Sequence, residues 1–185
     1  MNEIDFLSNS FYYFFSAVPQ ILGAVLALFG VFVLFKLQSL STEIIGELPS
    51  FYNFLNTRTI QEDQDAEERR IDLWYDVEKG IRTKNIKALK TSVDANAPAI
   101  AKYKDIIGYT EKFYKVYSEY DWLIKQTIRA STFTAAIIIT CLVILPLSGL
   151  IIPHPYLLYG LFTITVLSVA RTFTMLVIIL KKSIQ

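Results

Sequence analysis

Two long stretches without a charged residue constrain this chain more than any other feature. Residues 6–35 contain no Asp, Glu, Lys or Arg, and residues 130–170 contain none either. Because about 20 apolar residues cross the hydrocarbon core of a bilayer as a helix, the first stretch holds one span. The second stretch is too long for a single span, and a Pro-His-Pro sequence interrupts it at 153–155. It therefore predicts a hairpin of two spans.

The predicted fold class is an all-α membrane protein with three transmembrane helices. A hydrophobic content of 53% and a positive mean hydropathy agree with this class. Between the first two spans lies a charged segment of roughly ninety residues, in which apolar residues recur at helical spacing. The expected order is an external tail at 1–10, a span at 11–36, a cytoplasmic helical domain at 37–129, spans at 130–152 and 156–180 around an external turn at 153–155, and a cytoplasmic end at 181–185.

Basic residues beside the spans predict the orientation, because cytoplasmic flanks carry an excess of Lys and Arg. The tail before the first span and the turn at 153–155 have no Lys or Arg, so both are expected outside an inner (cytoplasmic) membrane. The basic residues at the other ends of the spans are Lys36, Lys125, Arg129, Lys181 and Lys182.

Helical spacing continues through the middle domain. Residues 39–56 have an amphipathic pattern that continues the first span, with a break expected near Pro49. A loop is expected at 56–64. Asn96-Ala97-Pro98 has the composition of a helix start, and the helix that follows is expected to run unbroken into the second span. Two shorter helical patterns lie between, one with Ile71, Trp74, Val77 and Ile81 and the next with Ile86, Leu89 and Val93.

Motifs of enzymes are missing from the sequence. The single histidine, His154, lies between two prolines in a predicted turn, which excludes zinc signatures that need two histidines. The acidic run at 62–68 lacks the glycine and the distal glutamate of a calcium loop and is interpreted as a solvated helix start. With a net charge of only +1, no global basic field indicates nucleic acid. The sequence thus predicts a non-enzyme without cofactor, metal or nucleic-acid partner.

One segment of the middle domain is basic and contains no acid. It could contact anionic lipid of the inner leaflet, or it could pair with the acidic run that precedes it. The second interpretation is favoured because the whole domain is nearly charge-balanced. The basic residues concerned are Lys79, Arg82, Lys84, Lys87 and Lys90.

The first span carries a stripe of small and polar residues, which we call the seam. Its members recur at spacings of three and four, a period of 3.5 that is typical of packed helices. Small residues allow close helix approach in lipid, and a glutamine there needs a partner. The seam could pack against the other spans of the same chain, join identical subunits or line a pore. It consists of Ser16, Gln20, Gly23, Ala27, Gly30 and Leu34.

Arg171 is the one unambiguous charge inside a span. It lies about 24 Å along the helix from Pro155, and no span contains a carboxylate to neutralise it. The side chain could extend to the inner headgroups, form an arginine ring on a pore, or bind lipid phosphate.

Two resemblances accompany these patterns. The run from Gln20 through Leu28-Phe29-Gly30-Val31-Phe32-Val33-Leu34-Phe35-Lys36-Leu37-Gln38 resembles the first span of a family of small three-span bacterial membrane proteins, which implies no particular activity. The layout, with an outside N-terminus, one span, a large cytoplasmic helical segment and a hairpin, is similar to the TolQ/ExbB/MotA energy-transducing subunits, which form rings around a partner helix. No residues carry over from that likeness.

The leading functional hypothesis is a homo-oligomer in membrane lipid that forms a pore or ion-channel-like assembly with a cytoplasmic helical collar. The alternative is a non-conducting scaffold or a stator-like subunit that acts with a partner protein.

Overall fold

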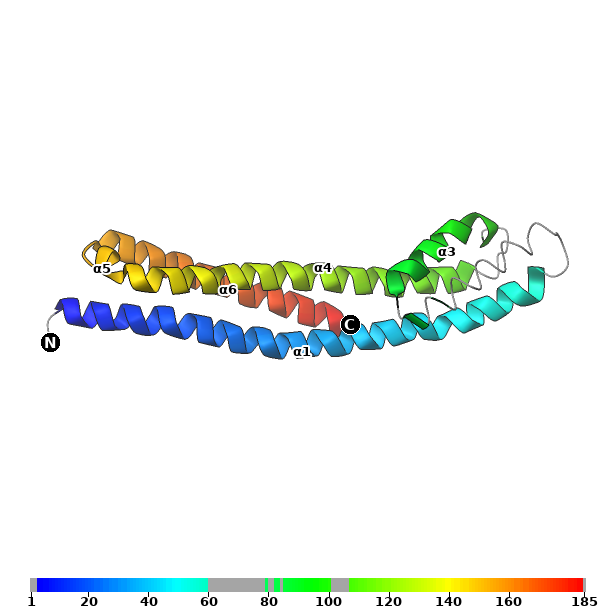
Figure 1. Ribbon diagram of the computed structural model, residues 1–185, viewed down its shortest axis with the longest axis horizontal. Helices are drawn as coiled ribbons and strands as arrows, with labels where there is room; N and C mark the ends of the chain where they lie inside the picture. The colour runs from blue at the N-terminus through cyan, green and yellow to red at the C-terminus, as the bar shows by residue number, and fades with distance from the viewer. Residues whose placement is uncertain (1–2, 60–78, 80–81, 84, 101–106, 185) are drawn as a thin grey trace. The chain divides into compact units, whose positions relative to one another are not determined.

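Helices make up the regular structure of the described chain (Figure 1). Three of them are long and apolar enough to cross a membrane, which confirms the predicted helical class and the number of candidate spans. These candidate spans are Phe6–Gly46, Glu111–Ile151 and Pro155–Ile184. The computed structural model describes residues 3–59, 79, 82–83, 85–100 and 107–184.

Helix α1 runs from Glu3 to Thr59 without interruption. The predicted break near Pro49 is therefore wrong, and so is the start of the predicted loop at 56–64, since residues 56–59 are helical. A proline removes one backbone donor from a helix, which leaves the carbonyl one turn earlier without its usual partner. At Pro49 that loss does not end the helix. The rest of the predicted loop lies outside the described residues, as does the predicted helix with Ile71, Trp74, Val77 and Ile81.

Helix α4 runs from Ile107 to Ile144 as a single element, which confirms the predicted unbroken helix over these residues; its predicted start at Asn96-Ala97-Pro98 belongs to another helix, and residues 101–106 lie outside the described residues. At Pro146 the α-helical pattern changes. A 3-10 turn, η2, covers Leu145–Leu147, and a short helix, α5, covers Ser148–Ile151. Because Pro146 cannot donate to the carbonyl of Leu142, the chain tightens at this point instead of continuing the α-helix.

The Pro-His-Pro sequence makes the predicted turn between the second and third helices. The amide of His154 donates to the carbonyl of Ile151 at 2.9 Å, which closes the turn after α5. The carbonyl of His154 then accepts from the amides of Leu157 and Leu158, both at 3.1 Å, and helix α6 runs Pro155–Ile184. Proline suits the first turn of a helix because its missing donor would have had no partner there.

Helix α3 covers Ile86–Ile100. The side chain of Asn85 accepts a hydrogen bond from the amide of Ala88 at 3.1 Å and caps the helix start. Asn96-Ala97-Pro98 lies in the last turns of α3, so its interpretation as a helix start is wrong. Pro98 removes the donor to the carbonyl of Asp94, yet the described residues on both sides of it are helical.

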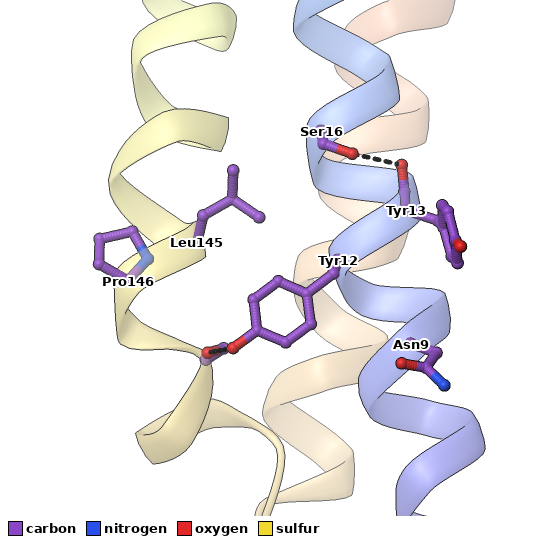
Figure 2. Close-up of a pocket in the computed structure, with 7 residues that line it drawn as sticks. Asn9, Tyr12, Tyr13, Ser16, Leu145 and Pro146 are labelled. Atoms are coloured by element: carbon purple, nitrogen blue, oxygen red, sulfur yellow. Dashed lines mark hydrogen bonds between the residues drawn. The ribbon is translucent and has the colours of Figure 1, made fainter.

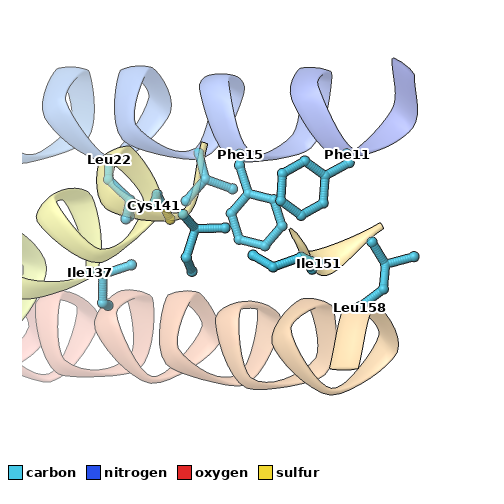
Figure 3. Close-up of a cluster of buried hydrophobic side chains, with 9 residues drawn as sticks. Phe11, Phe15, Leu22, Ile137, Cys141, Ile151 and Leu158 are labelled. Carbon is cyan, nitrogen blue, oxygen red and sulfur yellow. The ribbon is translucent and has the colours of Figure 1, made fainter. Parts of the chain in front are cut away.

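The chain divides into two compact units. The first contains Met1–Leu34 and Leu123–Gln185, and its core lies between α1, α4, α5 and α6 (Figure 3). Phenylalanine rings dominate that core, because the Phe162 ring centroid lies 4.5 Å from that of Phe14 and 5.4 Å from that of Phe15. The buried core residues are Phe11, Phe15, Val18, Leu22, Ile137, Cys141, Ile144, Ile151 and Leu158.

The second unit covers Phe35–Trp122. Within it, Lys36 of α1 lies 3.4 Å from the carboxylate of Glu119 on α4. On helix α3, Ile86, Leu89 and Val93 are all buried, which confirms the apolar helical spacing predicted for these three residues. The other buried apolar residues of the unit are Leu40, Ile44, Phe113 and Val116.

We predict that Phe15→Ala destabilises the first unit, because its ring is 0% exposed and contacts the rings of Phe11, Phe14 and Phe162. The loss should be about 3 kcal/mol, from the cavity and the lost contacts. Unfolding of the detergent-solubilised chain by titration with a denaturing detergent measures it. Phe35→Ala is the matched control, since Phe35 is 68% exposed on the same helix. Equal losses from both variants would contradict this account of the core.

Candidate functional site

The seam lies on a face of α1 that its own bundle does not cover. The buried residues of this part of α1 are Phe11, Phe15, Val18, Leu22, Phe29 and Val33. At 100° per residue, the centre of the seam lies about 120° around the helix from the centre of that buried face. The aromatic side of α1 therefore makes the contacts within the chain, and the small side remains outside them.

Both glycines of the seam face open space. A Cβ atom added at Gly23 or Gly30 would have no heavy atom within 4 Å. Gln20 and Ala27 are exposed, and Leu34 is 61% exposed. At these two glycines the described residues give no support to packing of the seam against the other spans of the same chain.

A pocket of about 700 Å³ opens where the seam approaches the N-terminal end of α1 (Figure 2). Asn9 and Ser16, seven residues apart, extend the heptad spacing of Gly23 and Gly30 toward that end. Extending the period backward from Ser16 could have identified Asn9 from the sequence. The residues that line the pocket are Asn9, Tyr12, Tyr13, Ser16, Leu145, Pro146 and Ser148.

Tyr12 connects the seam side of α1 to the hairpin. Its hydroxyl lies 2.5 Å from Oγ of Ser148 at the start of α5, and either oxygen could be the donor. Ser148 is buried, so this bond provides a partner for a hydroxyl that would otherwise be costly inside the bundle. The contact joins residues that are 136 positions apart, and nothing in the local sequence predicts it. The hydrogen bond lies at the edge of the pocket, next to Pro146, where the α-helix changes to the 3-10 turn η2.

Arg171 does not belong to the seam. Its guanidinium lies 5.4 Å from the centroid of the Phe133 ring on α4, in cation–π geometry, and the residue is exposed. Several threonines on these helices bond to their own backbone, whereas the buried hydroxyl of Thr127 on α4 has no hydrogen-bond partner among the described residues. Hydroxyls of Thr134, Thr163 and Thr172 donate to the carbonyl four residues earlier at 2.8–3.0 Å. Such bonds within a helix are ordinary and indicate no pathway.

The residues of the basic segment in the middle domain differ in their exposure and contacts. Lys79, Arg82 and Lys87 are exposed, whereas Lys84 lies outside the described residues. Lys90 forms an ion pair with Asp94 one turn later on α3, and its ammonium lies 5.6 Å from the ring centroid of Tyr117. Lipid contact through Lys90 would therefore compete with a contact inside the second unit. The acidic run at 62–68 also lies outside the described residues.

Asp94 connects α3 to α4. Its second carboxylate oxygen accepts a hydrogen bond from the Tyr114 hydroxyl at 2.8 Å. The hydrogen bond from Lys90, and then that from Tyr114, lower the pKa of Asp94 below its ordinary value of 3.8. In return, the hydrogen bond to Asp94 raises the pKa of Lys90 above its ordinary value. This network holds a helix of the middle domain in place; it has no catalytic arrangement.

No three His, Cys, Asp or Glu side chains within the described ranges lie where they could hold a metal ion. Cys141 is buried in the core of the first unit and has a free thiol. Comparison of the chain with protein-family models, with curated proteins and with solved structures found no match.

We predict that Asp94→Asn and Tyr114→Phe each loosen α3, with amide hydrogen exchange in α3 rising about two- to fivefold. The double variant should exchange little faster than Asp94→Asn alone, because both changes remove one shared contact. A lowered carboxyl pKa contributes stability above pH 3.8, and this contribution is lost as the pH falls below that value. Wild-type α3 should therefore exchange disproportionately faster in that acidic window, and Asp94→Asn should not. Fully additive effects of the two changes would contradict the network.

Proposed function

We propose that this chain is an integral membrane protein that self-associates through the seam of α1 and forms a pore or ion-channel-like assembly. The observation that carries the proposal is the open seam. Small and polar residues lie along one face of a candidate span, and the rest of the chain covers a different face. Residues that favour close helix contact thus remain available to a second copy of the chain.

Gln20 gives the seam a specific need for a partner. Its side chain is exposed and makes no hydrogen bond within the described residues. It lies about 24 Å along α1 from Lys36, within the apolar part of the helix. An amide in hydrocarbon without a hydrogen-bond partner is costly, whereas amides from neighbouring copies can donate to and accept from one another. Self-association, or water in a shared passage, would remove that cost.

A pore follows if several copies of α1 surround a common axis with their seams inward. Gln20 and Ser16 would then offer hydrogen-bonding groups to water, and Gly23, Ala27 and Gly30 would leave the passage wide. The pocket lined by Asn9 and Tyr13 would lie at the entrance. Polar residues inside a membrane mark a pathway when they face an aqueous cavity, which is the condition that such a ring supplies.

The alternative is a non-conducting scaffold or stator-like subunit that acts with a partner protein. The same small residues favour it, because Gly23, Ala27 and Gly30 permit a contact tight enough to leave no passage. Currents across planar bilayers that contain the purified protein distinguish the two functions. A stable oligomer without conductance would support the scaffold.

The orientation proposed for this assembly has the N-terminus and the hairpin turn outside the inner membrane. The middle domain, with the unit at Phe35–Trp122, would then form a helical collar in the cytoplasm. Basic residues at the corresponding ends of the spans support this orientation, since Lys36, Arg129 and Lys181 all fall on the proposed inner side.

We predict that Gly23→Leu and Gly30→Leu disrupt self-association, because a large side chain prevents close approach of two seams. The mass of the oligomer in mild detergent measures this, and the dissociation constant should rise at least tenfold. Ala17→Leu is the matched control, because Ala17 is an exposed residue of the same helix and lies about 100° around it from the centre of the seam. An unchanged oligomer in both glycine variants would reject the seam as an interface. If Ala17→Leu disrupts it equally, the contact lies elsewhere on α1.

We predict that single cysteines at positions 9 and 154, in a Cys141→Ala background, react with a membrane-impermeant thiol reagent in intact cells. A cysteine at position 87 should react only after the cells are opened. All three native residues are exposed, so access depends on the side of the membrane and not on burial. Labelling of position 87 from outside would overturn the proposed orientation.

A further inference from the structure

We propose that Arg171, together with Arg129 and Phe133, binds the phosphate of an anionic glycerophospholipid. The lipid would belong to the leaflet on the side of Lys181 and Lys182. The inference requires that α4 and α6 span a membrane, but it is independent of self-association through α1 and of conduction.

Charge is the first reason. The unit that contains Arg171 has only two carboxylic side chains, Glu3 and Asp5, and both lie at the N-terminal end of α1. No Asp or Glu follows Asp121 anywhere in the chain. The guanidinium group carries a positive charge, and this unit supplies no carboxylate side chain beyond Glu3 and Asp5 to pair with it. In a bilayer, the abundant anion is the lipid phosphate.

The environment of Arg171 on α6 is the second reason. Ile164, Leu167 and Ile178 lie on the same side of the helix, within one or two turns, and all three are exposed large hydrophobic residues. Such a surface is suited to acyl chains. The guanidinium therefore emerges among side chains that face lipid, where a phospholipid can reach it.

The stacking on Phe133 determines which part of the guanidinium is available. The Phe133 ring covers one face of the group at 5.4 Å, which leaves the in-plane N–H donors uncovered. These donors have the fork geometry that matches two phosphate oxygens. An aromatic support also limits the rotamers of a long side chain, so less freedom remains to be lost when a ligand binds.

Arg129 supplies a second cation on the same face. It lies four residues before Phe133 on α4, one helical turn closer to the proposed inner surface, and is exposed. No ion pair of Arg129 occurs within the described residues. The four residues from Arg129 to Phe133 rise about 6 Å along α4, a distance that a single phosphodiester headgroup held by Arg171 can cover. Two positive charges without a carboxylate favour a headgroup with a net negative charge over a zwitterionic one.

Native mass spectrometry of the full-length protein tests the proposal. The protein is released from micelles that contain equal amounts of phosphatidylglycerol and phosphatidylcholine, and bound lipids are counted. Wild type should retain phosphatidylglycerol preferentially, and Arg171→Gln should lower its retention about tenfold, as expected for one charge-assisted fork. Arg171→Lys should recover only part of it, because an ammonium keeps the charge but loses the planar fork. Phe133→Leu should weaken retention while leaving every charge in place.

Lys181→Gln is the matched control, because it removes one positive charge from an exposed position on the same helix. It should retain phosphatidylglycerol like the wild type. The proposal is overturned if Arg171→Gln retains the lipid like the wild type, or if Lys181→Gln loses as much, since the attraction would then be a general effect of charge. Equal retention of both lipids by the wild type would also overturn it. Helix content by circular dichroism confirms that each variant is folded.

Discussion

The backbone of a chain in hydrocarbon must find its hydrogen-bond partners within its own helices, and this constraint organises the first unit. Where the constraint is met without interruption, α4 and α6 are long and apolar. Where Pro146 prevents it, the helix changes to a 3-10 turn and a short α5, and the Tyr12–Ser148 hydrogen bond forms there. The pocket that includes Asn9 and Tyr13 lies at the same level (Figure 2). The Tyr12–Ser148 hydrogen bond and the pocket thus lie together at the hairpin end of the bundle.

The two faces of α1 differ in what they contact within the described chain. Phe11 and Phe15 turn inward and pack against Phe162 of α6, so the bundle is held by aromatic rings and not by close backbone approach. Water does not drive that packing inside a bilayer, which makes the fit of the rings the main source of stability. As a result, the chain does not need Gly23 and Gly30 for its own fold. The proposal of self-association rests on their open surroundings within the described residues.

The long-range features of the sequence predicted the helices better than its local signals did. Uncharged stretches and the spacing of Ile86, Leu89 and Val93 correctly located helices, because burial acts on many residues at once. The local signals misled at Pro49 and at Asn96-Ala97-Pro98, because both lie inside helices although a proline removes one backbone hydrogen bond from a helix. Periodicity placed the seam on one face but could not say what covers it. The contacts of Tyr12 with Ser148 and of Arg171 with Phe133 depend on the fold and have no local signature.

Gln20 and Arg171, both in the first unit, need different kinds of partner. An amide both donates and accepts hydrogen bonds, so Gln20 can be satisfied by Gln20 of an identical chain. A guanidinium only donates and carries a fixed charge, so a second Arg171 would repel it and an anion is required. The two residues also lie on different helices, with Arg171 held against α4 by the Phe133 ring. Under the two proposals, the seam of α1 would contact another copy of the chain, and the Arg171 side of α6 would contact lipid.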